Sequence, residues 1–409
     1  MEELLKKYAK VILSTCLKVE KGQPLVISAN YERIDFVRVI AKEAYELGVT
    51  DIYFDLTDVY LKHDALKALS IDDLKKLSFF NKQHWDVYAE KGAAFLMLVS
   101  ETPGVMSDIS PELISELTIH TYNTRNKFSE LRDKSMVPWC IAAVPTESWA
   151  KQVFPDSPTP LNDLWNQIFE ICNINKDNPN EILQEKIERL NNYCKVLNNY
   201  NFKSLRYQNS LGTDFTIELP TNHIWESGNS KLVNGKEVLV NFPTEEVFTS
   251  PVRDSANGIV YSSKPLAYQD NIINNFWIKF ENGVAVEWDA EEGKEVLENI
   301  IKSCENADKL GEVALVEYNS SISKSGLVFY ETLFDENASC HLALGTGFPE
   351  CIENGINMTK EELNEKGINT CTNHVDFMIG TKDLTIIGKT HNDEEIVIFE
   401  NGDFSKELK

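Results

Sequence analysis

Residues 23–58 read QPLVISANYERIDFVRVIAKEAYELGVTDIYFDLTD, and this stretch decides the fold of the first half of the chain. Apolar runs of strand length stand at each end, at 23–29 and 50–58. Between them, residues 31–48 carry apolar side chains at helical spacing. A strand, a helix and a second strand in this order are typical of a parallel sheet.

The same alternation continues on the C-terminal side of this stretch. We expect helices over 67–92 and 110–135, and strands at AAFLMLVSE (93–101) and WCIAAVPT (139–146). Four apolar strands separated by helices predict a Rossmann-like or flavodoxin-like α/β domain. The turn after the first strand, NYERID, lacks the glycines that let a backbone approach a pyrophosphate. We therefore expect a structural or substrate-gating domain that binds no nucleotide cofactor.

The second half of the chain has a different pattern. An Asn-rich helical connector is expected over 161–201, and a further helix over 294–308. The segments after the connector are short, β-rich and joined by Gly, Asn and Asp turns, with Asn282-Gly283 and Asn401-Gly402 as turns between strands. These β-rich segments are SLRYQNSLGTDFTIELP, KEVLVNFP (236–243), NGIVYSSKPL, IINNFWIKFENGVAVEWDA, EVALVEY, HLALG, HVDFMIG, LTIIG and EIVIFENG. We predict an N-terminal domain, residues 1–200, and a C-terminal β-rich α+β domain, residues 201–409.

Composition excludes several partners. The chain has 409 residues, of which 42% are hydrophobic, and a net charge of −24. No apolar stretch approaches the roughly 20 residues that span a bilayer, and the segment MEELLKKYAKVIL mixes acidic and basic residues. The charge opposes nucleic acids and anionic membranes and attracts cations. We expect a cytoplasmic protein that binds neither nucleic acid nor membrane.

The 8 cysteines point to the same compartment. They are spread through the chain without a C-x-x-C pair. Free or buried thiols in a reducing compartment fit this distribution better than a disulfide scaffold.

Ionisable residues inside apolar, strand-like runs of the second half predict a metal-binding hydrolase site. Each would be costly to bury without a partner or a cation. In HVDFMIG, residues two apart share a strand face, so His374 and Asp376 point the same way. The other candidates are Glu246 in NFPTEEVFTSP, Glu312 in GEVALV and His341 in DENASCHLALG. His374 and Asp376 could also be a hydrogen-bonded structural pair, and a lone buried histidine is usually a satisfied core residue.

Other chemistries have less support in the sequence. Cys340 and Cys371 stand near His341 and His374, but zinc-finger spacing is absent and we interpret these thiols as packing residues. The chain has no G-x-S-x-G, P-loop or H-E-x-x-H motif.

The strings NFPTEEVFTSP, GEVALVEYNSSISKSGLVFYETLFDENASCHLALGTGFP and NHVDFMIG resemble those of the M29 metallo-aminopeptidases, the family of aminopeptidase T, aminopeptidase S and PepS. The likeness extends over nearly the whole chain and includes SWAKQVFP in the first half. It implies a two-domain enzyme, usually a homodimer, that uses a pair of divalent ions in its C-terminal domain to release N-terminal amino acids from peptides. The resemblance also implies that Glu246, Glu312, His341, His374 and Asp376 are the metal ligands.

Peptide hydrolysis needs an activated water, a polarised carbonyl and a proton for the leaving amine. Two ions about 3.5–4 Å apart can supply the first two. We predict Glu312 as a bridging ligand or proton shuttle, and Glu245 as a weaker candidate for the general base or for binding the substrate α-ammonium group. The mixed N and O ligand set suits zinc, cobalt or manganese.

One position departs from the family pattern. Phe348 stands where the family has a tyrosine at or beside the metals. Two other functions stay open: a di-metal amidase acting on small or modified amides, and a non-catalytic peptide-binding protein on a degenerate peptidase fold, which Phe348 suggests.

Overall fold

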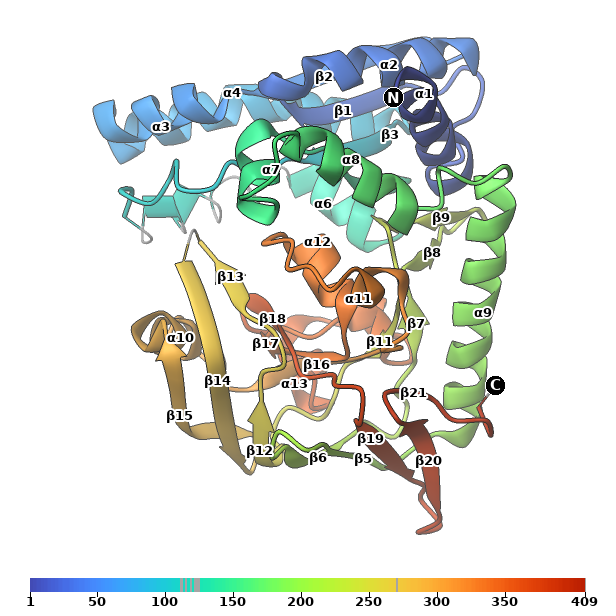
Figure 1. Cartoon of the computed structure of the whole chain (residues 1–409), viewed down its shortest axis with the longest axis vertical. Helices are drawn as coiled ribbons and strands as arrows, with labels where there is room; N and C mark the ends of the chain where they lie inside the picture. Colours follow the sequence, from blue (N-terminus) through green and yellow to red (C-terminus); the bar gives the residue numbers. More distant parts are fainter. Residues whose placement is uncertain (111–112, 115, 118–119, 121–125, 270, 409) are drawn as a thin grey trace. The chain divides into compact units, whose positions relative to one another are not determined.

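The computed structural model describes residues 1–110, 113–114, 116–117, 120, 126–269 and 271–408 (Figure 1). The chain divides into two compact units, Met1–Gln184 with Asn229–Pro243, and Glu185–Gly228 with Thr244–Lys409. The first boundary between the units therefore lies inside a helix, between Gln184 and Glu185, and not at residue 200 as the sequence suggests. Assignment of catalysis to the C-terminal part stays a prediction.

The first unit contains the predicted parallel sheet. Among the described residues its strand order is β10-β4-β3-β1-β2, and every pair in it is parallel. The strands are β1 (Leu25–Asn30), β2 (Ile52–Thr57), β3 (Ala94–Val99), β4 (Trp139–Ala143) and β10 (Asn241–Phe242). The helices are α1 (Glu2–Val11), α2 (Ile34–Glu46), α3 (Val59–Ala68), α4 (Ile71–Glu90), α6 (Asn126–Asp133), α7 (Glu147–Val153) and α8 (Pro160–Ile171).

The structure changes one assignment in this unit and describes only part of another predicted element. The segment KEVLVNFP, which we assigned to the second domain, instead gives β9 (Glu237–Leu239) and β10 in the first unit. That assignment was wrong because β10 pairs with β4, far away in sequence, with Asn241 opposite Ile141. The helix expected over 110–135 is described only as α6, since 111–112, 115, 118–119 and 121–125 lie outside the described residues.

Helices cover both faces of the parallel sheet. On one face, Trp85 of α4 and Phe128 of α6 pack with Phe95 of β3. On the other, Tyr8 of α1 stacks with Phe36 of α2 and lies edge-on to Trp165 of α8. Burial of both faces explains the nearly continuous apolar runs of these strands.

The second unit begins in α9 (Pro179–Tyr200) and contains two antiparallel sheets among its described residues. The larger sheet contains β5 (Ser204–Gln208), β6 (Asp214–Glu218), β12 (Asn257–Tyr261), β13 (Leu266–Tyr268), β14 (Asn271–Glu281), β15 (Val284–Glu292), β19 (Thr385–Lys389), β20 (Glu395–Glu400) and β21 (Asp403–Phe404). The predicted turn between β14 and β15 is confirmed. Both Asn282 and Gly283 have positive φ, 49° and 86°, as a type I′ hairpin requires.

The smaller sheet has the order β18-β17-β16-β11-β7 in the described part of the unit. Its strands are β7 (Glu226–Ser227), β11 (Glu246–Thr249), β16 (Leu310–Val316), β17 (His341–Gly345) and β18 (His374–Met378). One hydrophobic core contains side chains of both sheets and of α9. Figure 1 shows the short helices α11 (Ser321–Ser325) and α12 (Thr332–Asp335) on the other side of the smaller sheet, and α10 (Lys294–Ile301) beside β15.

The predicted α/β class, with a parallel-sheet part and a β-rich part, is thus confirmed. None of the helices in the described residues is long and apolar enough to cross a membrane.

Candidate metal centre

The five predicted ligands lie on one face of the smaller sheet. Strand pairing places Ala343 opposite both Glu312 and Asp376, and cross-strand partners point to the same face. His341 lies opposite Ala314, two residues after Glu312, and therefore shares this face. Glu246 lies two residues before Phe248, which is opposite Ala314, so Glu246 also points to this face. His374 lies two residues before Asp376 and points the same way. The alanines between the ligands leave room for their longer side chains.

The opposite face of these strands explains why the chain folds in this register. The intervening residues are Val247, Val313, Leu342, Val375 and Phe377, and all belong to the hydrophobic core. A slip of one residue would bury the ionisable side chains in that core and expose the apolar ones. Core burial therefore fixes the strand alignment on which the polar cluster depends.

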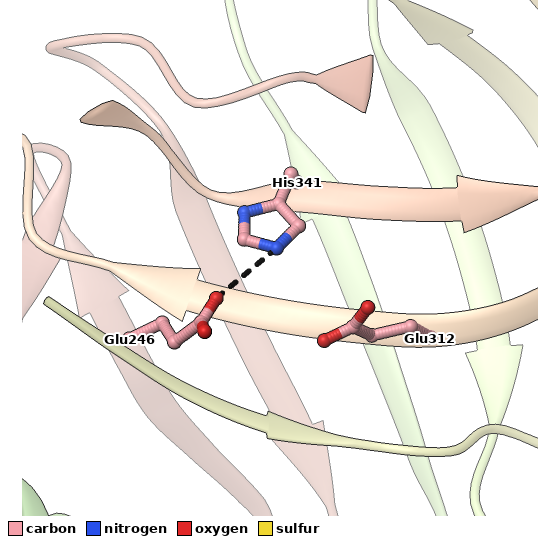
Figure 2. A group of neighbouring side chains, drawn as sticks. All are labelled: Glu246, Glu312 and His341. Atoms are coloured by element: carbon pink, nitrogen blue, oxygen red, sulfur yellow. Dashed lines mark ion pairs between the residues drawn. The ribbon is translucent and has the colours of Figure 1, made fainter. Parts of the chain in front are cut away.

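The ligand atoms form two groups that share one residue. The first group is Glu246, Glu312 and His341, and the second is Glu312, His374 and Asp376; within each, the ligand atoms lie within 4.8 Å of one another. Figure 2 shows the imidazole of His341 and the two carboxylates of the first group pointing toward a common space. Glu312 is the residue that belongs to both groups.

Backbone carbonyls orient both imidazoles. His341 Nδ1 lies 3.1 Å from the carbonyl oxygen of Ser339, and His374 Nδ1 lies 2.8 Å from that of Thr346. If each Nδ1 donates its proton there, each Nε2 keeps a lone pair for the cluster. His341 Nε2 lies 3.3 Å from Glu246 Oε2, and His374 Nε2 lies 3.1 Å from an oxygen of each of its two carboxylate neighbours, Glu312 and Asp376.

The ionisable groups of the cluster strongly affect one another's pKa values. Burial raises the pKa of Glu312 to about 7. Burial opposes charge on His341 too, but the carboxylates of Glu246 and Glu312 outweigh it and raise its pKa to about 10. At Asp376 burial is outweighed by His374, whose positive charge lowers the pKa of Asp376 to about 2. Protons on the imidazoles thus supply the positive charge that these carboxylates require.

The donor set fits divalent cations. Two imidazole nitrogens and three carboxylates form two compact groups. Nitrogen and oxygen ligands of these kinds bind zinc, cobalt or manganese. Asp376 Oδ1 is buried, and its charged neighbour is His374 Nε2 at 3.1 Å. A buried carboxylate in such a cluster requires a positive charge nearby, which a cation can supply.

Glu336 was not predicted from the sequence. It lies close enough to the cluster for the charges of its carboxylates to act on it. Burial, followed by the charges of Glu246 and Asp376, raises its pKa well above the ordinary value. The next residue, Asn337, is fully buried and donates to Glu336 Oε1 at 3.3 Å. The Asn337 Oδ1 atom accepts from the backbone N–H of Glu245 at 2.7 Å. The segment before His341 is thereby tied to the residue before Glu246, a link between distant segments that has no local sequence signal.

Glu245 is not in either ligand group. Its Oε1 atom lies 2.6 Å from Nζ of Lys186 in α9, and Glu245 is buried while Lys186 is partly buried. This salt bridge gives Glu245 a charged partner of its own. Its predicted role as a general base or ammonium-binding group stays a prediction.

The ring of Phe348 lies beside the second ligand group. Its centroid is 5.0 Å from that of His374, and on its other side Phe248 approaches edge-on at 5.3 Å. The backbone N–H of Phe348 donates to Ser250 Oγ at 2.7 Å. These contacts fix the ring next to a predicted ligand, where the family tyrosine was expected.

A further carboxyl group, that of Glu226, shares this sheet face, because Glu226 of β7 pairs with Phe248. Burial and the charge of Glu350 raise the pKa of Glu226 from 4.5 to about 7. The folded protein therefore favours the neutral carboxyl, which stabilises it fully below pH 4.5, and this contribution is lost as the pH rises through 7.

Glu226→Gln should remove this pH dependence because glutamine stays neutral. We expect the free energy of unfolding of the variant, relative to the unaltered protein, to rise by about 1 kcal/mol between pH 4.5 and 7, a value discounted for partial solvent exposure. Urea unfolding at a series of pH values measures it. The exposed Glu361→Gln should show no such trend. A pH-independent difference for Glu226→Gln would contradict the assigned cause.

Comparison with known proteins agrees with the fold. Residues 1–404 match the family described as thermophilic metalloprotease (M29). The chain is 37% identical to aminopeptidase 2 of Geobacillus stearothermophilus, over 100% of this chain and 99% of the relative. It is also 37% identical to aminopeptidase AmpS of Bacillus subtilis, with 98% of each covered. The solved structure of wild-type AmpT from Thermus thermophilus superposes with a TM-score of 0.91 at 30% identity, covering 98% of this chain and 99% of that one.

These matches place the protein among the metallopeptidases. Within that class, the chain belongs to the M29 family of thermophilic metalloproteases. The resemblance drawn from the sequence motifs is confirmed, and so is the expectation of a hydrolase.

Proposed function

We propose that this protein is a metal-dependent aminopeptidase that removes N-terminal amino acids from peptides with the help of two divalent cations. The observation that carries the proposal is that Glu312 belongs to two groups of ligand atoms, each compact enough for one cation. A carboxylate shared in this way is suited to bridge two ions. The aminopeptidase names of the relatives support the substrate class.

Zinc, cobalt or manganese would be held by Glu246, Glu312 and His341 in one group, and by Glu312, His374 and Asp376 in the other. Such a pair would activate water and stabilise negative charge on the carbonyl oxygen of the substrate. Glu312 is the bridging ligand or proton shuttle in this assignment.

The surrounding residues prepare the site. Backbone carbonyls of Ser339 and Thr346 hold the two imidazole rings in place, so that little reorganisation is needed during the reaction. Asn337 joins the segments that carry Glu246 and His341, and it keeps the first group together.

Two other functions make different predictions. A di-metal amidase would keep the metal groups but would not require a free N-terminus. A degenerate peptide-binding protein, suggested by Phe348, would bind metal without turnover.

The test uses metal-stripped protein and a short leucyl peptide, free or N-acetylated. We expect no hydrolysis without metal, and recovery of free-peptide cleavage with zinc, cobalt or manganese. Equal cleavage of both peptides would identify an amidase. Bound metal without cleavage would identify the binding protein and overturn the proposed activity.

We also propose that the enzyme acts in the cytoplasm as a homodimer. The acidic composition and eight free cysteines support a reducing compartment, and the family resemblance supports the dimer. Sedimentation equilibrium measures the assembly state, and a mass of one chain would contradict the dimer.

A further inference from the structure

Two cysteines from separate segments lie close together, and one of them, Cys371, is three residues before the predicted ligand His374. Cys304 follows α10, and Cys371 precedes β18. Asn369 joins the two segments, since its Nδ2 donates to the carbonyl oxygens of Asn306 at 3.0 Å and Lys309 at 3.3 Å. Its Oδ1 accepts from the backbone N–H of Cys371 at 3.2 Å.

Polar contacts link the two thiols more directly. Ser303 Oγ donates to Cys304 Sγ at 3.8 Å and accepts from Asn373 Nδ2 at 3.2 Å. The backbone N–H of Asn373 in turn donates to Cys371 Sγ at 3.5 Å. The two thiols also form a hydrogen bond with each other, which lowers the pKa of Cys304 and raises that of Cys371.

The two thiols differ in reactivity. Burial alone would raise the pKa of Cys304, but hydrogen bonds from Cys371 and Thr372 lower it below 9.0. Burial and the neighbouring Cys304 raise the pKa of Cys371 to about 12, and only 8% of Cys371 is exposed. Cys304, which is half-buried, is therefore the more accessible and more acidic of the two.

We propose that Cys304 and Cys371 are a redox pair that a hydroperoxide converts into a disulfide. The thiolate of Cys304 attacks a peroxide oxygen and becomes a sulfenic acid, and with hydrogen peroxide the leaving hydroxide takes up a proton to give water. The sulfur of Cys371 then attacks Cys304 Sγ, with loss of its own proton and release of a second water. Two thiols are oxidised by two electrons, one peroxide is reduced, and a thiol reductant reverses the change.

The disulfide acts on a predicted metal ligand. Asn373, whose backbone N–H now donates to Cys371 Sγ, precedes His374 and accepts from its backbone N–H through Oδ1 at 3.0 Å. The carbonyl oxygen of Asn373 also accepts from Thr346 N at 2.7 Å, and Thr346 O lies 2.8 Å from His374 Nδ1. Disulfide formation moves the Cys371 sulfur toward Cys304, and this movement disturbs the hydrogen bonds of Asn373 that hold His374 in place. We expect oxidation to weaken metal affinity about 10- to 100-fold, as does loss of a residue that hydrogen-bonds to a metal ligand. This expectation rests on the proposed metal site.

The first experiment detects the bond itself, independently of activity. Full-length, metal-stripped protein is treated with hydrogen peroxide, digested without reductant and analysed by mass spectrometry. We expect a peptide pair linked through Cys304 and Cys371. Cys371→Ser should instead leave a sulfenic acid on Cys304 that a dimedone probe traps, whereas Cys304→Ser should give neither product.

The chain contains an internal control for this reaction. Cys16 and Cys140 also interact with each other, but both are fully buried, and burial raises the pKa of Cys16 well above its usual range. These thiols should stay reduced. Absence of the 304–371 link, or equal oxidation of both pairs, would overturn the redox pair.

The second experiment measures cobalt affinity by chelator competition before and after oxidation. We expect the loss of affinity to be reversed by dithiothreitol and to be absent in Cys371→Ser. A disulfide that leaves cobalt affinity unchanged would overturn its coupling to His374. Failure of the reduced protein to bind cobalt at all would instead count against the proposed metal site, while the disulfide result would stand.

Discussion

Glu312→Gln should lower kcat/KM for a leucyl peptide by about a thousandfold or more, a loss of about 4 kcal/mol of transition-state stabilisation. Glu312 is the residue that both ligand groups share. Glutamine has nearly the same shape, but it lacks the negative charge that two neighbouring cations require. The substitution therefore affects both groups at once, whereas loss of Glu246 or Asp376 removes a ligand from one group.

The measurement combines peptide hydrolysis with metal content by elemental analysis. We expect the variant to retain less metal and to keep its circular dichroism spectrum, because burial already favours a neutral side chain at this position by raising the pKa of Glu312 to about 7. Glu361→Gln, an exposed change in the same unit, provides the control and should behave like the unaltered protein. A Glu312→Gln enzyme with normal turnover and metal content would remove Glu312 from the bridging position.

Local sequence predicted that His374 and Asp376 lie together, whereas the choice of Glu246 over Glu245 came from the family resemblance. In HVDFMIG, the period of a strand places His374 and Asp376 on one face and Val375 and Phe377 on the other, and the structure has this arrangement. The ionisable residues were informative because each interrupts an apolar run. A residue that is costly to bury and nevertheless lies in a strand requires a partner, and here the partners are one another.

Long-range pairing could not be predicted in the same way. The strand β10 is two residues long, and its place beside β4 depends on a partner about a hundred residues earlier in the chain. Glu336 and Asn337 lie in a 3-10 helix of only 3 residues, which is too short for a periodic pattern to reveal the direction of a side chain. Likewise, the salt bridge of Glu245 with Lys186 depends on how α9 packs against β11, which the local pattern TEEV does not contain.

Phe348→Tyr should raise kcat by about 10- to 100-fold with little change in metal content. The ring is already positioned beside the second ligand group, with its centroid 5.0 Å from that of His374 and its backbone held by Ser250. Tyrosine keeps the ring and adds a hydroxyl group, which can donate a hydrogen bond to a developing oxyanion. Deleting one such donor costs about a hundredfold or more in other enzymes, and restoring one gains at most a comparable factor.

Phe248→Tyr is the matched control for this change, because Phe248 lies edge-on to Phe348 on the same sheet face. It adds the same hydroxyl group to a ring that packs against Phe348, whereas Phe348 itself packs against His374, so we expect kcat to change by less than about twofold. Steady-state kinetics of both variants at saturating metal, with metal content measured in parallel, separate the two positions. An unchanged kcat in Phe348→Tyr would exclude Phe348 from the catalytic account. An equal gain in both variants would show that the effect does not depend on the place of the hydroxyl beside His374. A gain in Phe348→Tyr alone would mean that this chain keeps the metal ligands of its family while lacking one donor that increases the rate.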